Sequence, residues 1–83
     1  MPRSPHIEQA VIDVLKNVSR RPIEPTPASD LLADLGFDSL QVMETVAELE
    51  DRFGVSLPLD DLAGTRTVAQ VVALVSALVE GGQ

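Results

Sequence analysis

The chain has 83 residues, a net charge of −7 and no cysteine, and two phenylalanines are its only aromatic residues. This length fits one small domain over residues 1–83, frayed at 1–3 and 81–83, and the missing thiols exclude disulfides and thiolate metal sites. An acidic chain without aromatic stacking platforms argues against nucleic-acid binding, and no stretch is apolar enough to span a membrane or serve as a secretion signal.

The first predicted helix covers residues 4–18. Its apolar residues recur at the spacing of one helix face, namely Ile7, Ala10, Val11, Val14, Leu15 and Val18. Ser4 suits the N-cap and Pro5 suits the first helical position. Arg20 and Arg21 follow, where positive charge complements the carboxyl end of the helix dipole.

A long extended crossover is predicted next, because prolines at 22, 25 and 27 disfavour helix. Within it, "SDLLADLG" predicts one or two helical turns that begin at Ser29 or Asp30 and stop at Gly36. We expect its three leucines to pin this loop to the core, namely Leu31, Leu32 and Leu35.

The second helix is predicted to begin at Asp38 and to end at Gly54. Asp38 as N-cap and Gln41 form a capping box, which puts Ser39 at the first helical position. The expected buried stripe is Leu40, Met43, Val46, Ala47, Leu49 and Phe53. The expected exposed face is Gln41, Glu44, Thr45, Glu48 and Asp51.

The last third of the chain predicts a short helix and a long one. "PLDDLAG" suggests one or two turns closed by Gly64, and Thr67 with Gln70 forms a capping box that opens a helix through Val79. Valine richness raises a strand alternative for "VAQVVALV", but the spacing favours helix. Its apolar face is Val68, Val71, Val72, Val75, Leu78 and Val79. The predicted fold is all-α, a small four-helix bundle of three main helices and one short helix.

Ser39 has two interpretations. It can serve only local hydrogen bonding at a helix start. Alternatively, its exposed hydroxyl is a point of covalent attachment, because helix amides favour a phosphate ester there and Gly36 allows close approach to the backbone. A catalytic nucleophile is disfavoured, since the chain lacks G-x-S-x-G and has His6 as its only histidine. We expect no catalytic residue and no metal site, because Asp30, Asp34 and Asp38 do not follow the calcium-loop pattern.

The segments "DLGFDSL", "VMETVAELEDRFGVSLP" and "TVAQVVALV" resemble an acyl carrier protein, and the resemblance covers nearly the whole chain. It implies that Ser39 is esterified with 4′-phosphopantetheine, which a phosphopantetheinyl transferase takes from coenzyme A. The motif residues around that cofactor site are Gly36, Asp38 and Leu40. The arm ends in a thiol that carries an acyl group as a thioester, and it would supply the sulfur that the chain lacks.

The same resemblance implies that the exposed face of the second helix docks on basic patches of partner enzymes, such as an acyl-loading ligase or transferase, or a ketosynthase. Besides the motif residues Asp38 and Leu40, the matching positions are Gln41, Glu44, Ala47, Glu48 and Asp51. Gln41, Arg52 and the basic N-terminal segment depart from the acidic pattern. They favour a dedicated pathway over generic fatty-acid synthase docking.

We therefore expect a cytoplasmic, monomeric carrier of fatty-acid, polyketide or related secondary-metabolite biosynthesis, and Met1 with a complete helix set favours a free-standing protein. The bundle is expected to part between its second and last helices to shelter an acyl chain. The candidate lining is Met43, Val46, Leu62, Val68 and Val72. An aminoacyl or peptidyl carrier stays open, although no glycine-histidine pair precedes the serine. An acidic helical interaction module without a prosthetic group is the alternative of a different class.

Overall fold

The computed structural model describes residues 5–58, 60 and 64–81. Within them lie the helices α1 (Pro5–Val18), α2 (Ser39–Phe53) and α4 (Val68–Gly81), and an antiparallel bridge between Asp30 and Thr67 is the only β pairing. The all-α prediction with a long first connection is confirmed. Ser4 and most of the predicted short helix lie outside the described residues. None of the described helices is long and apolar enough to cross a membrane.

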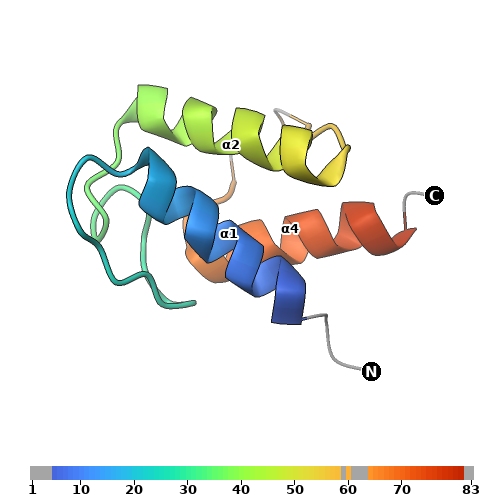
Figure 1. Ribbon diagram of the computed structural model, residues 1–83, viewed down its shortest axis with the longest axis horizontal. Coiled ribbons are helices and arrows are strands. Elements are labelled where there is room, and N and C mark those ends of the chain that lie inside the picture. The colour runs from blue at the N-terminus through green and yellow to red at the C-terminus, as the bar shows by residue number, and fades with distance from the viewer. Residues whose placement is uncertain (1–4, 59, 61–63, 82–83) are drawn as a thin grey trace.

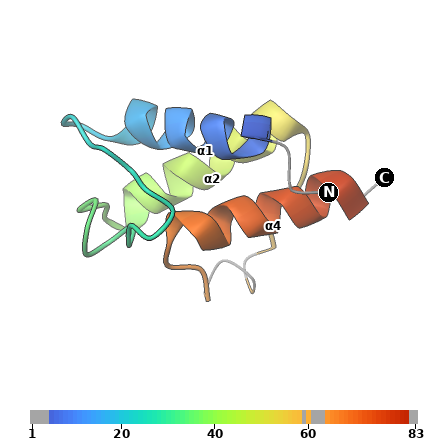
Figure 2. The ribbon, with the colours of Figure 1, turned by 90° about the horizontal axis from the view of Figure 1, so that it is seen from below.

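The helix α1 packs against both α2 and α4 (Figures 1 and 2). The loop of residues 19–38, called the crossover loop below, occupies one end of the bundle, where α2 begins (Figure 1). In both views α1 begins and α4 ends at the opposite end. The start of α2 therefore lies beside the loop, far from the outer ends of α1 and α4.

The core is aliphatic apart from Phe37, and every main segment contributes to it. The predicted face of α1 is confirmed, because Val11, Val14 and Leu15 are fully buried. The buried apolar residues are Ile7, Val11, Val14, Leu15, Leu31, Leu35, Phe37, Leu49, Leu57, Val68, Val71 and Val75. In α4, Val79 is the exception to the predicted face, since it is 39% exposed.

The inward face of α2 differs from the predicted one. Gln41, Thr45 and Leu49, at i, i+4 and i+8, are buried, whereas Leu40 and Met43 are 57% and 64% exposed. The polar residues are tolerated inside because their hydrogen bonds are satisfied locally. Gln41 Oε1 accepts from Asp38 N at 3.2 Å, and Thr45 Oγ1 donates to the Gln41 carbonyl at 2.9 Å. Hydrophobicity alone therefore misplaced this face.

The crossover loop makes one turn at residues 31–35, and Asp30 starts it. Asp30 Oδ1 accepts from the amides of Leu32 and Ala33 at 2.9 and 2.8 Å. Leu31 and Leu35, an i, i+4 pair, are buried and hold the loop to the core as expected. Leu32 is 55% exposed, so the prediction that it also packs into the core is wrong. A single turn directs only one such pair inward, and the residue next to it points away.

Ser76 is fully buried in α4, and its hydroxyl has no hydrogen-bond partner among the described residues. Because an unsatisfied buried hydroxyl is destabilising, we expect Ser76→Ala to raise the free energy of unfolding by about 1 kcal/mol. Urea denaturation followed by circular dichroism measures the change. Ser56→Ala, at an exposed serine, is the control and should stay within about 0.5 kcal/mol of wild type. A loss of stability in Ser76→Ala would contradict the prediction.

Candidate functional site

Ser39 is the first residue of α2, and its side chain is exposed. The capping box leaves it without a capping role. Asp38 has extended backbone angles (φ −98°, ψ −179°), its Oδ1 accepts from Gln41 N at 2.8 Å, and the Gln41 side chain accepts from Asp38 N. No hydrogen bond to another described residue engages the Ser39 hydroxyl. The predicted capping box is confirmed, and the Ser39 side chain lies exposed beside it.

Gly36 lies three residues before Ser39, at the end of the turn in the crossover loop. Its φ of +73° falls in the left-handed region that favours glycine. A Cβ built there would lie 2.6 Å from Nη2 of Arg21, so the side chain of Arg21 is what approaches it closely. Gly36 therefore shapes the approach to α2 without contributing a polar side chain to the site.

The Ser39 side chain opens onto a groove of about 440 Å³ between α2, the crossover loop and the segment before α4. The other described lining residues are Leu31, Leu32, Val42, Met43, Thr65 and Arg66. Two exposed apolar side chains, Leu32 and Met43, belong to it, and Arg66 is its only described charged residue. The place of Leu32 and Arg66 beside Ser39 is not foreseeable from the serine motif, since neither residue belongs to it.

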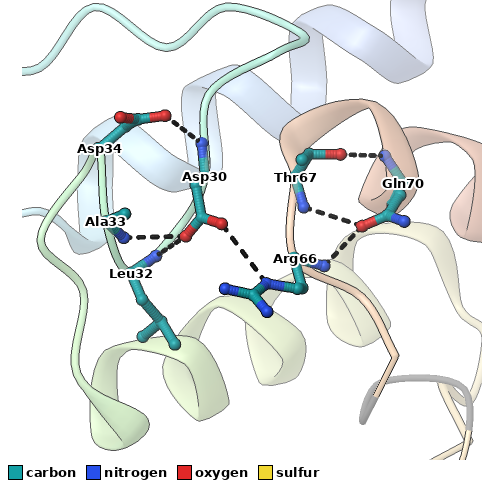
Figure 3. Close-up of polar contacts among 7 residues, drawn as sticks. All are labelled: Asp30, Leu32, Ala33, Asp34, Arg66, Thr67 and Gln70. Atoms are coloured by element: carbon teal, nitrogen blue, oxygen red, sulfur yellow. Dashed lines mark hydrogen bonds and ion pairs between the residues drawn. The ribbon is translucent and has the colours of Figure 1, made fainter.

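Arg66 belongs to a polar network that joins the crossover loop to the start of α4 (Figure 3). The Leu31 amide donates to the Arg66 carbonyl at 2.8 Å, and the Val68 amide donates to the Ser29 carbonyl at 3.0 Å. Arg66 Nε lies 3.5 Å from Asp30 Oδ2. The predicted Thr67–Gln70 capping box is confirmed, since each accepts from the backbone amide of the other. The network holds together the two segments that border the serine.

Asp30 is the acidic centre of this network. The amide of Ala33 has the largest effect and, with the Leu32 amide and the charge of Arg66, lowers the pKa of Asp30 below its ordinary value of 3.8, although desolvation opposes the change. A carboxyl group with a lowered folded-state pKa stabilises the fold above its unfolded pKa, and this contribution is lost as pH falls through the folded pKa.

Asp30→Asn should therefore lower the free energy of unfolding at neutral pH, because it removes the charge that these donors favour. The deficit relative to wild type should shrink as pH falls below about 4 and vanish in stronger acid, where Asp30 is protonated in both states. Urea denaturation of both proteins across this pH range is the measurement. Two curves that stay parallel from neutral to acid pH would contradict the prediction.

The expected partner-binding residues of α2 mostly gather on one surface. Glu44, Ala47, Glu48 and Asp51 line an open groove beside Asn17 and Val18 of α1. We call these four residues of α2 the acidic strip. Gln41 does not belong to it, because its side chain is 8% exposed and engaged in the capping box. Leu40 lies next to Ser39 and is exposed, as a residue that contacts a partner would need to be.

The five candidate residues for an acyl pocket do not meet at one place. Met43 lines the outer groove, Val46 lines a small internal cavity of about 20 Å³, and Leu62 is outside the described residues. Val68 and Val72 lie instead along a groove with Pro27. The internal cavity is bounded mainly by residues not foreseen, including Val42, Leu49, Val71 and Val75.

Other acidic residues serve the local structure. The carboxylates of Asp34 and Asp38 accept hydrogen bonds from backbone amides, as the carboxylate of Asp30 does. In the described part of the chain, no cluster of three or more candidate side chains is suited to hold a metal ion. Glu50 accepts a hydrogen bond from the Leu57 amide at 2.7 Å and anchors the segment after α2.

An exposed serine at the start of a helix that also bears an acidic strip is the arrangement that a carrier domain needs. Residues 9–75 match the family model of the phosphopantetheine attachment site. The chain belongs to the acyl carrier protein family, a family of non-catalytic carriers whose prosthetic group is phosphopantetheine.

Individual relatives agree with this family. The chain is 46% identical over 59 residues to the meromycolate extension acyl carrier protein of Mycolicibacterium aurum, an alignment that covers 71% of this chain and 61% of that protein. The chain thus spans about three fifths of the length of such curated relatives. A structure assigned as an acyl carrier protein from Mycobacterium tuberculosis has a TM-score of 0.81 and 31% identity, with coverage of 86% and 96% of the two chains. The acetyl actinorhodin acyl carrier protein of Streptomyces coelicolor has a TM-score of 0.68 and 28% identity, with coverage of 92% and 93%.

The residues around Ser39 fit a phosphopantetheine group. The serine hydroxyl is exposed, the first turn of α2 contains no acidic residue, and the adjoining groove combines apolar side chains with one arginine. A phosphate ester suits the amide end of a helix, and an extended, partly apolar arm suits a groove bordered by Leu32 and Met43.

Proposed function

We propose that Ser39 carries 4′-phosphopantetheine and that the chain is a carrier of acyl intermediates in fatty-acid, polyketide or related biosynthesis. The observation that supports this most directly is the exposed Ser39 hydroxyl. It does not cap the helix, because Asp38 and Gln41 form the capping box. We propose further that residues 1–83 act as one monomeric carrier domain in the cytoplasm.

Attachment requires little of the chain beyond presentation of the hydroxyl. The Ser39 Oγ forms a bond to the pantetheine-bearing phosphorus of coenzyme A, the pyrophosphate bond breaks, adenosine 3′,5′-bisphosphate leaves, and the hydroxyl proton passes to a base of the phosphopantetheinyl transferase. The dipole of α2 stabilises the new negative charge. When attached, the group supplies a terminal thiol that holds an acyl group as a thioester.

The acidic strip is the proposed docking surface for the transferase, for an acyl-loading ligase or transferase, and for a ketosynthase or other pathway enzyme. Its three carboxylates, Glu44, Glu48 and Asp51, lie along one groove. An exposed ion pair contributes about 0–1 kcal/mol. Several such pairs therefore favour rapid, salt-sensitive encounters, which suit a carrier that visits successive enzymes.

Acyl cargo is favoured over aminoacyl cargo by the named relatives, which include a meromycolate extension carrier and an acetyl-bearing carrier. The sequence "GFDSL" also lacks a glycine-histidine pair before the serine. The alternative of an interaction module without a prosthetic group finds no support in the family match.

Incubation with coenzyme A and a broad-specificity transferase, followed by intact-mass measurement, tests the attachment. We expect the mass to rise by one phosphopantetheine. Protein purified from its native host should carry the same adduct, and the mass released by thioester cleavage should identify the cargo as acyl or aminoacyl. A chain that stays unmodified in both samples would contradict the proposal.

Sheltering of an acyl chain would use the small internal cavity, which shares Leu31, Val42 and Thr65 with the groove beside Ser39. Its volume of about 20 Å³ is close to that needed for one water molecule, so α2 and α4 would have to part. NMR shifts of Val46 and Val75 should then change between the thiol form and a long-chain acyl form. Unchanged shifts would exclude sheltering.

A further inference from the structure

Ser39 and Arg66 lie on the same groove although they come from different segments of the chain. The other described side chains of that groove are apolar or, in Thr65, uncharged, so Arg66 is the only charged group among them. Its ion pair with Asp30 accounts for one side of the guanidinium, and the rest of this charge lies on a partly apolar groove beside the attachment serine.

The backbone of Arg66 is held in place on both sides. Its carbonyl accepts from the Leu31 amide at 2.8 Å, and its amide donates to Gln70 Oε1 at 2.7 Å. Figure 3 shows the contact with Gln70 and the ion pair with Asp30, which link the residue to the start of α4 and to the crossover loop. The guanidinium therefore extends from a fixed base.

The pairing with Asp30 leaves most of the guanidinium unused. Arg66 Nε lies 3.5 Å from Asp30 Oδ2, which is an ion pair and longer than an ordinary hydrogen bond. The Arg66 side chain is 70% exposed, whereas that of Asp30 is 20% exposed. An arginine presents five donors in a planar fork, and no other described residue forms an ion pair with this one.

A phosphodiester at Ser39 would follow Asp38 directly in the chain, and the two neighbouring negative charges would repel each other. The amide end of α2 offsets part of that repulsion. A guanidinium can offset the rest of the repulsion, because its planar fork of N–H donors matches two phosphate oxygens. Arg66 is the described cation that shares a groove with Ser39.

We propose that Arg66 is the counter-ion of the phosphodiester at Ser39, a positioning residue that holds the start of the arm over the groove lined by Leu32 and Met43. The guanidinium bridges this phosphate and Asp30, so loading strengthens the connection between the crossover loop and α2. This inference rests on the proposed attachment at Ser39.

The test compares loaded wild type with loaded Arg66→Gln, each first verified by intact mass. We expect loading to shift the Nε–Hε NMR signal of Arg66, and Arg66→Gln to shift the phosphorus resonance of the arm, which is the only phosphorus in the protein. This difference should disappear in about 1 M NaCl, where the screening length is about 3 Å. Arg66→Lys should restore part of it, because the charge returns without the fork.

Two further variants separate a direct contact from indirect effects. Arg52→Gln removes the same charge from the last turn of α2 and should leave the phosphorus resonance at its wild-type position. Asp30→Asn removes the ion pair but keeps Arg66, so it should not reproduce the shift seen in Arg66→Gln. The proposal is overturned if Arg66→Gln leaves the resonance unchanged, or if either control variant shifts it equally. If no protein gains the phosphopantetheine mass, the attachment at Ser39 itself is wrong, and this is known before any spectrum is recorded.

Discussion

Ser39→Ala should abolish phosphopantetheine loading completely, because Ser39 carries the only hydroxyl group of the motif "DLGFDSL". The fold should survive, since the Ser39 side chain is exposed and Asp38 with Gln41 forms the capping box. A change at such a surface position usually stays within about 0.5 kcal/mol. Intact mass after incubation with coenzyme A and a transferase measures loading, and circular dichroism measures helix content.

Ser56→Ala is the matched control, because it removes the hydroxyl of another exposed serine. It should load as wild type does. An adduct on Ser39→Ala would show that the arm attaches elsewhere, and a loss of helical signal would show that Ser39 supports the fold. Either result would contradict the proposal that Ser39 is the attachment site and has no structural role.

Leu49→Ala should cause the largest loss of stability among single changes in α2. Leu49 is fully buried in the aliphatic core, and removing a buried leucine side chain costs about 2–5 kcal/mol. Small domains have total stabilities near the lower end of about 5–15 kcal/mol. The variant should therefore unfold at much lower urea concentration, and part of it should be unfolded in buffer. Urea titration followed by circular dichroism is the measurement.

Leu40→Ala makes the same chemical change in the same helix at a side chain that is 57% exposed. Its free energy of unfolding should change by no more than about 0.5 kcal/mol. The two variants together test which face of α2 is inward. Equal losses, or a larger loss in Leu40→Ala, would restore the face predicted from hydrophobicity and contradict the structure.

The positions of the helix ends were predictable because they depend on neighbouring residues. Asp38 caps α2 through the amide of a residue three positions away, and Gly54 ends it with φ +66° and ψ +35°. Thr67 and Gln70 act over the same short range at α4. Such signals need no knowledge of the rest of the fold, so the location of Ser39 at a helix start followed from the sequence.

The inward face of α2 was not predictable in the same way. The helix carries apolar residues on more than one side, so its hydrophobic pattern allows several rotations. The capping box draws Gln41 inward and the Thr45 hydroxyl bonds to the backbone, which makes both residues acceptable in the core. The apolar side chains of Leu40 and Met43 are left outside, near the serine.

By itself the sequence determined the three main helices, the N-caps of α2 and α4 and the serine motif, because each depends on contacts between residues a few positions apart. Only the tertiary structure decided what surrounds Ser39. Leu32 and Arg66 reach its groove because the bridge between Asp30 and Thr67 brings the crossover loop to the segment before α4. Such pairing depends on how the packed helices place distant segments, and local residue patterns do not record it.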